Sequence, residues 1–280
     1  VETITTMPFG LFKDILKSAE DIFKKDFGDS SPLTVEINSN LPFNGAKLTS
    51  TTTHNCKYDS ALENSLSLEY EHQSGFKLEK LEFAPGASGS FTTETSLTQN
   101  DLKLEFKGND NEKADISVKY VLPQATITAN VDASDFKSYG ATVSSGVDNI
   151  KFGLSADSKN GASPSFAASV AMAADKMFFG LNLTNNFTNI KGLFSFAVDS
   201  NVTVAANCTY GTAKKNLGAG IATVYKCNKN TIIKAKADMN KNVNLSVKQA
   251  VKEGLTATAW TSVSDFKPAS ATFGAKIVIG

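Results

Sequence analysis

The stretch Ala61-Leu-Glu-Asn-Ser-Leu-Ser-Leu-Glu-Tyr-Glu71 alternates apolar and polar side chains with a period of two. Its leucines and Tyr70 share one phase, while serine and glutamate fill most of the other. Successive side chains of a β-strand point to opposite faces, so this stretch predicts a strand with one apolar and one polar face. The same pattern returns along most of the chain, which indicates a fold built almost entirely from such strands.

Turn-forming Gly, Pro, Asn and Asp residues separate these stretches. We expect about 17–19 strands, each about the 9–11 residues that cross a bilayer obliquely. The fourth stretch is irregular, because Phe76 and Leu78 share one phase and Leu81 and Phe83 the other; a bulge is predicted at Glu79 and Lys80. The alternating stretches are 33–38, 46–53, 61–71, 75–83, 90–97, 102–107, 114–121, 125–132, 152–156, 166–172, 177–183, 194–198, 202–208, 217–225, 231–238, 243–251, 255–263 and 271–279.

So many two-faced strands favour one large closed transmembrane β-barrel, with lipid outside and water inside. A barrel of about 16–18 strands or more is too wide for side chains to fill, and it leaves an aqueous channel. The alternative is a soluble β-sandwich, or a pair of them, which shares the signal of short regular strands. A sandwich leaves the amino-terminal segment described below without a role.

Composition narrows the classes of function. With 41% hydrophobic and 20% charged residues in 280, the chain is not expected to be disordered. No window holds the roughly 18–20 apolar residues of a membrane-spanning helix. The amino terminus lacks the features of a secretory signal; the resemblance described below implies a barrel imported into an organelle after synthesis. The 28 basic and 28 acidic residues balance, which argues against a nucleic-acid binder.

The sequence carries no pattern of an enzyme. Cys56, Cys208 and Cys227 have no CxxC spacing, and the two histidines have no partners at metal-ligand spacing. Neither a P-loop nor a glycine-rich dinucleotide motif opening a helix is present. We therefore expect no catalytic residue, no metal and no cofactor.

The amino-terminal segment has a different period. From Phe9 to Lys25, apolar residues recur three and four positions apart, with charged residues opposite, which predicts an amphipathic helix ending near Gly28. Three roles compete. A transit peptide would be rich in arginine and poor in acids, unlike this segment. The helix could lie on the membrane surface, or dock its apolar face on the barrel wall and expose its charges to water. We favour the third role.

Several motifs resemble those of the eukaryotic mitochondrial porins, the voltage-dependent anion channels. Asp14-Ile-Leu-Lys-Ser-Ala-Glu-Asp-Ile-Phe-Lys-Lys25 resembles the helix of that family. Leu102-Lys-Leu-Glu-Phe106 resembles a family strand, although Asp101 replaces a usual glycine. Residues 246–258 resemble the penultimate hairpin. The stretch 272–279 is similar to the sorting signal of mitochondrial outer-membrane barrels, through Thr272, Gly274, Ile277 and Ile279.

The resemblance implies a 19-stranded barrel of the mitochondrial outer membrane, the strand number known for that family. Residues 1–30 would be an amino-terminal segment whose helix lies in the lumen, and residues 31–280 the barrel. The implied function is voltage-gated passage of ATP, ADP, phosphate and small ions. Implied partners are membrane lipids, the permeating nucleotides and anions, further copies of the chain, and cytosolic kinases or a larger membrane complex. Two alternatives stay open: the barrel subunit of the mitochondrial protein-import channel, and a structural porin-like subunit with a blocked pore.

Charged residues of the polar phase are the candidate site, because ion preference in a wide pore is a summed field effect. Three departures from the family predict a weak anion preference: Glu20 replaces a common basic residue, Asp26 stands near a glycine-rich hinge, and Thr34 and Asn38 occupy positions that are often lysine. The resemblance places Lys17 and Lys25 at the constriction. The candidate residues are Lys13, Lys17, Glu20, Lys24 and Lys25 on the helix, and Lys103, Lys107, Lys234, Lys236, Lys248 and Lys276 on the wall.

Overall fold

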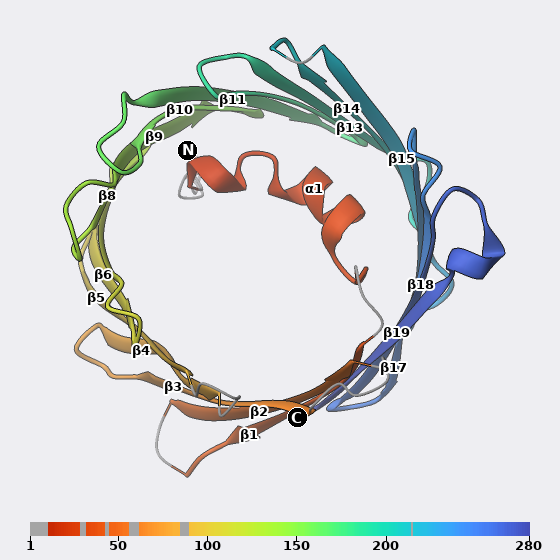
Figure 1. Ribbon diagram of the computed structural model, residues 1–280, viewed down its shortest axis with the longest axis horizontal. Coiled ribbons are helices and arrows are strands. Elements are labelled where there is room, and N and C mark those ends of the chain that lie inside the picture. The colour runs from red at the N-terminus through yellow and green to blue at the C-terminus, as the bar shows by residue number, and fades with distance from the viewer. Residues whose placement is uncertain (1–10, 29–31, 43–44, 56–61, 85–89, 214) are drawn as a thin grey trace, which may run out of the picture.

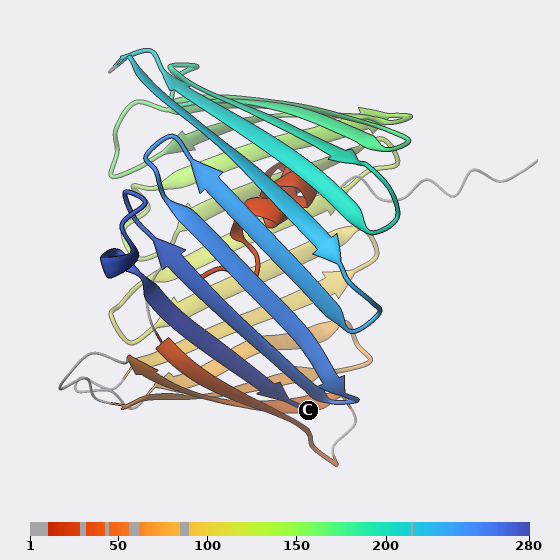
Figure 2. The same cartoon turned by 90° about the vertical axis from the view of Figure 1, so that its right-hand side faces the viewer.

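The computed structural model describes residues 11–28, 32–42, 45–55, 62–84, 90–213 and 215–280. Within them, 19 strands form one closed sheet, the wall of a barrel seen end-on in Figure 1 and from the side in Figure 2. The elements are η1 (Phe12–Asp14), α1 (Lys17–Lys24), β1 (Pro32–Asn40), β2 (Ala46–Asn55), β3 (Leu62–Glu71), β4 (Phe76–Ala84), β5 (Ser90–Gln99), β6 (Leu102–Asn109), β7 (Ala114–Val121), β8 (Ala125–Asp132), β9 (Tyr139–Val147), β10 (Ile150–Ser158), β11 (Ser165–Ala174), β12 (Met177–Thr184), β13 (Asn189–Ala197), β14 (Val202–Gly211), β15 (Asn216–Lys226), β16 (Thr231–Asp238), β17 (Val243–Lys252), β18 (Leu255–Val263), η2 (Pro268–Ser270) and β19 (Thr272–Ile279).

The barrel closes where its first and last strands meet. β1 runs parallel to β19, with Leu33 beside Ala275 and Ile37 beside Ile279, while each consecutive pair of strands is antiparallel. Closure leaves no strand edge with unpaired backbone groups, which is the condition for a sheet to span lipid. No helix among the described residues is both long enough and apolar enough to cross a membrane.

The expected division of faces is confirmed. On β12, Met177 and Phe179 are about half exposed on the outer surface, whereas Phe178 between them packs inside against the helix. Large apolar side chains are exposed in this way on nearly every strand. Because such a surface is unstable in water, the outer face is the one that meets lipid.

Strand β9 is absent from the stretches expected from the alternation. Its outward phase contains Ala141 between Tyr139 and Val143, and Ser145 between Val143 and Val147, so small and polar residues weaken the signal. Its neighbours impose the strand, since β9 pairs along its whole length with β10 and over most of it with β8. Tertiary pairing here overrides a weak local pattern.

The bulge predicted in β4 is confirmed. Between the pairs Leu68–Leu81 and Tyr70–Leu78, β3 contributes one residue and β4 contributes two, Glu79 and Lys80. An extra residue bends the strand and changes the phase of the side chains. Leu78 and Leu81 therefore both stay in the outward phase, and Glu79 turns into the lumen, where it contacts Lys103.

The amino-terminal helix differs from the single helix expected between Phe9 and Lys25. A 3₁₀ turn, η1, precedes the eight-residue α1, and Ile15 and Leu16 lie at the break between them. Consecutive side chains of a regular helix point about 100° apart. The break lets both of these residues pack against the wall, where each is 4% exposed. Phe9 and the expected domain boundary at residues 30 and 31 lie outside the described residues.

The predicted docking of the helix on the wall is confirmed. Ile15, Leu16 and Ala19 are buried in one cluster with Ala171 of β11 and Leu193 of β13. Figure 1 shows α1 inside the barrel, closer to the wall formed by β11–β15 than to β1–β6. Because burial removes these apolar side chains from luminal water, the hydrophobic effect holds this segment in place. We call residues 11–28 the luminal segment.

Candidate pore and its charged lining

The middle of the luminal segment is bound to the wall by an ion pair. Glu20 accepts hydrogen bonds from Lys191 of β13 and from Lys24 one helical turn further on. Burial raises the pKa of the Glu20 carboxyl, but these two lysines outweigh it and hold the pKa below its ordinary value. Lys24 belongs to the helix itself, so Lys191 is the partner that links the helix to the barrel.

The carboxyl end of α1 is surrounded by lysines from β16 and β17. Lys236 donates to the carbonyl oxygen of Phe23 at 3.1 Å, and Lys234 donates to that of Lys25 at 3.1 Å. These contacts satisfy carbonyls that have no partner within the helix, and they place positive charge at the negative end of its dipole. The Lys236 ammonium also lies 4.5 Å from the centroid of the Phe27 ring.

Asp26 pairs with two of the wall lysines. Its Oδ2 lies 2.9 Å from Nζ of Lys234, and its Oδ1 lies 3.4 Å from Nζ of Lys248. Burial raises the pKa of the Asp26 carboxyl, yet the hydrogen bond and charge of Lys234, followed by those of Lys248, lower it on balance. The carboxylate therefore stays ionised wherever an ordinary aspartate is ionised.

The chain passes Trp260 immediately after this contact. A Cβ built on Gly28 would lie 2.3 Å from the indole ring, and one built on Gly274 would lie 2.4 Å from it. Only glycine allows the indole to approach the backbone so closely at both positions. Gly274, predicted as part of the sorting signal, thus also makes room for Trp260. Thr272 and Gly274 share the luminal phase of β19, while Ile277 and Ile279 share the outward phase.

The wall formed by β4, β5 and β6 has a different charge network. Lys103 Nζ lies 2.9 Å from Glu79 and 2.8 Å from Glu105, and Glu79 also accepts a hydrogen bond from Ser96. Lys77 lies 3.1 Å from Glu79. Acids and lysines of neighbouring strands neutralise one another here with no contribution from the luminal segment.

The other predicted site residues are spread around the lumen. Lys107 pairs with Glu94 at 2.8 Å, and Lys276 pairs with Glu36 at 2.7 Å across the closing seam. Lys13 and Lys17 are exposed on the free side of the luminal segment. The structure thus brings Lys234, Lys236 and Lys248 together at the end of α1 and keeps Lys103 and Lys107 on another wall. Whether these lysines attract anions stays a prediction.

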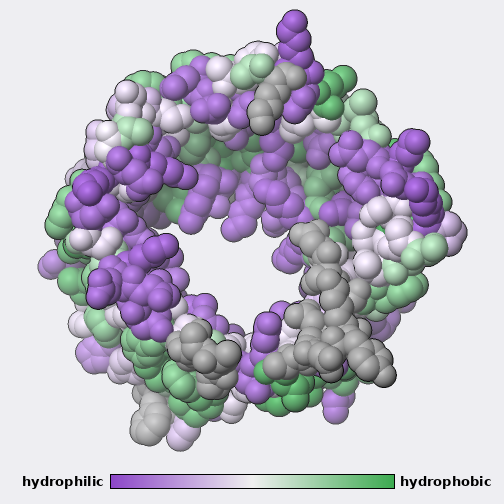
Figure 3. All heavy atoms as spheres, in the orientation of Figure 1, coloured by the Kyte–Doolittle hydropathy of each residue, from purple (hydrophilic) through white to green (hydrophobic). Residues whose placement is uncertain are grey.

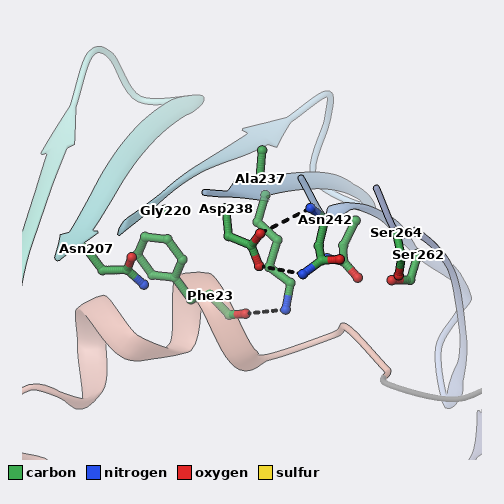
Figure 4. Close-up of a pocket in the computed structure, with 10 residues that line it drawn as sticks. Phe23, Asn207, Gly220, Ala237, Asp238, Asn242, Ser262 and Ser264 are labelled. Carbon is green, nitrogen blue, oxygen red and sulfur yellow. Dashed lines mark hydrogen bonds between the residues drawn. The ribbon is translucent and has the colours of Figure 1, made fainter. Parts of the chain in front are cut away.

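A polar recess lies between α1 and the wall. It has a volume of about 380 Å³ and is lined by Phe23, Lys236 and polar residues of β14–β18. Asn242 donates two hydrogen bonds to Asp238, as Figure 4 shows. Lys236 donates to the Phe23 carbonyl oxygen. Most side chains around the recess are polar, so the space between helix and wall is compatible with water.

An open passage remains beside the luminal segment. Figure 3, seen along the barrel, shows a central opening bordered mostly by hydrophilic residues, with hydrophobic residues on the outer surface. A wet passage through an apolar shell lets polar solutes cross, and its lining charges determine which sign of ion is preferred. Among the described residues, no cluster of acidic, histidine and cysteine side chains could hold a metal ion.

Asp26 is the contact that sequence reasoning missed. Its carboxylate is 222 residues from Lys248 in sequence, and no local pattern pairs them. The available signal was its position, because a charged residue directly after the amphipathic helix can reach whichever wall the helix meets. The partner of that charge depended on where the helix docks.

The chain as a whole has counterparts among known proteins. Residues 9–274 match the family described as eukaryotic porin. The chain belongs to this family. The mitochondrial outer membrane protein porin of Neurospora crassa is 26% identical over 279 residues, which cover 93% of this chain and 94% of that protein.

Solved structures with a similar fold come from a bacterial porin. A mutant of the Rhodopseudomonas blastica porin aligns with 10% identity and a TM-score of 0.50, covering 88% of this chain and 95% of its own. A triple mutant of the same porin gives 11% identity, a TM-score of 0.50 and the same coverage. These likenesses concern the barrel fold alone. The family match and the Neurospora crassa relative make this chain a porin channel and a multi-pass β-barrel of the mitochondrial outer membrane.

Proposed function

We propose that this porin is a voltage-gated, weakly ion-selective diffusion channel for ATP, ADP, phosphate and small ions. The observation that carries the proposal is the polar passage left open beside the docked luminal segment. Solutes in a channel of this width keep their hydration, so permeation needs no binding site or catalytic group. The name of the Neurospora crassa relative supports the setting in the mitochondrial outer membrane.

Weak selectivity is supported by the way luminal lysines are compensated. Lys191, Lys234 and Lys276 each lie beside a carboxylate, from Glu20, Asp26 and Glu36. A lysine paired in this way contributes little to the long-range field that attracts anions. We therefore expect a small preference for anions, with nucleotides and phosphate crossing as hydrated anions.

Voltage gating is supported by family membership. The luminal segment carries four lysines and four acidic residues between positions 11 and 28, so its displacement as a unit moves no net charge and does not by itself sense voltage. Its departure would remove its contacts with Lys234, Lys236 and Lys248 and so change the field in the pore. The remaining expected partners, namely further copies of the chain, cytosolic kinases or a larger membrane complex, stay predictions.

Recording from purified protein in planar bilayers tests the proposal. We expect stepwise conductance that falls at high voltage of either sign, a reversal potential close to zero in a KCl gradient, and current when ATP is the main anion. Silence would favour a structural subunit, and block by presequence peptides would favour the import channel. A strongly anion-selective reversal potential would contradict weak selectivity. Bilayers exposed to detergent alone are the control.

A further inference from the structure

The luminal segment ends in a residue whose backbone and side chain are both unusual. Asp26 has a φ of +68°, in the left-handed region that residues with a Cβ rarely adopt. Its side chain is 13% exposed and that of Lys234 is 10% exposed, although both lie within a water-filled barrel. This combination occurs where the chain turns from α1 toward β1.

Such a backbone conformation persists when surrounding contacts determine it. Asparagine and aspartate tolerate the left-handed region better than other residues with a Cβ, but glycine adopts it most readily. At Asp26 the contacts are those of Lys234 and Lys248, which hold the two carboxylate oxygens from adjacent strands. The residue thus gives up the freedom of glycine at this turn and gains a charged contact with the wall.

We propose that Asp26 is a positioning and selectivity residue, which fixes the end of the luminal segment to β16 and β17 and offsets one of the two positive charges that Lys234 and Lys248 bring to the pore. We call Asp26, Lys234 and Lys248 the Asp26 clamp. The selectivity half of this inference rests on the proposed channel function, whereas the positioning half does not.

Removal of the carboxylate has a definite electrostatic consequence. Lys234 still donates to the Lys25 carbonyl, so the lysines stay near the luminal segment with their charge uncompensated. One unit charge at about 10 Å from the ion path, at the dielectric of water, changes the local concentration of each monovalent ion by about twofold at low salt. The pore without this carboxylate is therefore more anion-selective.

Trp260 provides a readout of position that needs no current. It is the only tryptophan of the chain, and its indole packs against Gly28, two residues beyond Asp26. Loss of that packing exposes the ring to luminal water, which shifts its emission to the red and makes it more accessible to acrylamide, a neutral quencher.

The test uses Asp26→Asn, which keeps the preference for the left-handed backbone and removes the charge. We expect a reversal potential shifted toward that of chloride, equivalent to about a fourfold rise in the anion-to-cation permeability ratio, together with red-shifted Trp260 emission. The matched control is Asp265→Asn, because Asp265 also has a left-handed φ and a lysine neighbour but is exposed in a loop. The control should change neither measurement.

Asp26→Gly distinguishes the effect of the carboxylate from the effect of the backbone conformation. If the clamp positions the segment, this variant loosens Trp260 packing at least as much as Asp26→Asn. If backbone shape alone mattered, glycine would leave or tighten the packing, and positioning by the carboxylate would be wrong.

Lys234→Met combined with Asp26→Asn tests the pairing. The double variant should return the reversal potential close to that of the unaltered protein, because the net charge of the clamp is restored; a shift as large as that of Asp26→Asn alone would overturn the inference. Absence of current in the unaltered protein would instead overturn the proposed function, and the fluorescence arms would still decide the positioning role.

Discussion

Two walls of this barrel balance their charges in different ways. On β4–β6, the partners of Lys103 are Glu79 and Glu105, both belonging to the wall itself. On β16 and β17, the partners of Lys234 and Lys248 come from the luminal segment, through Asp26 and the carbonyl of Lys25. The first wall keeps its charge balance whatever the helix does, while the second depends on it.

The difference indicates that the luminal segment acts as part of the electrostatic lining, in addition to narrowing the pore. Its apolar side binds near β11–β13, and its carboxyl end compensates a basic wall. Detaching the segment would therefore widen the passage and strengthen the positive field on one side only. Four measurements examine this asymmetry.

Leu16→Asp should have the largest effect. Leu16 is buried against the wall, and an unpaired charge there costs about 3 kcal/mol or more, which shifts docking more than a hundredfold. We expect a detached segment, a higher single-channel conductance and red-shifted Trp260 emission. Ser18→Asp adds the same charge at an exposed position and is the control. Normal conductance and emission in Leu16→Asp would show that the apolar contacts do not hold the segment.

Lys103→Met and Lys248→Met compare the two walls directly. Each variant removes one positive charge, so both should shift the reversal potential toward that of potassium, by about a fourfold change in permeability ratio at low salt. Only Lys248→Met should alter Trp260 emission, because Lys103 has no contact with the luminal segment among those described. Equal fluorescence changes would remove the distinction between the walls.

We expect acid to break the contact of Asp26 with β16 and β17 only at low pH. The pKa of Asp26 lies below its ordinary value of 3.8 because the two wall lysines stabilise the charged form beyond the opposing effect of burial. A depressed folded-state pKa adds stability above the ordinary value, and that stability is lost as the pH falls through the folded value.

Trp260 emission should therefore stay constant from pH 7 to about 4.5 and change only at more acidic pH, below the ordinary aspartate range. In Asp26→Asn, the acid-induced change assigned to Asp26 should be absent. A transition centred near pH 6 would contradict the assignment, since neither Asp26 nor Glu20 would titrate there.

Lys24→Gln should have the smallest effect. Lys24 is exposed and pairs with Glu20 four residues earlier, and such pairs contribute about 0.3–0.5 kcal/mol. Glu20 keeps Lys191, so the midpoint of thermal unfolding followed by Trp260 emission should barely move. A decrease of more than about 1 kcal/mol in the free energy of unfolding would mean that the exposed side of the helix contributes as much to stability as its docked side.

Much of the fold was predictable because its signal is local. Strands 114–121 and 125–132 were predicted at the bounds that the structure has, and the β4 bulge appeared as a phase change within nine residues. β9 was not predicted, because Ala141 and Ser145 leave its outward face without a clear apolar phase. The break between η1 and α1 was missed for a related reason. The helical periodicity continues through Ile15 and Leu16, so only contact with the wall interrupts the helix between Asp14 and Lys17.

By itself, the sequence determined which side of each strand meets lipid, which side of the helix is apolar, and where the lysines stand along the strands. These are consequences of residue order, because a side chain's face follows from its position within its own strand or helix. Tertiary structure alone decided the partners. Closure of β1 on β19 and docking of α1 near β13 bring Asp26 to Lys248 across 222 residues, since pairing depends on distances in space that no local period contains.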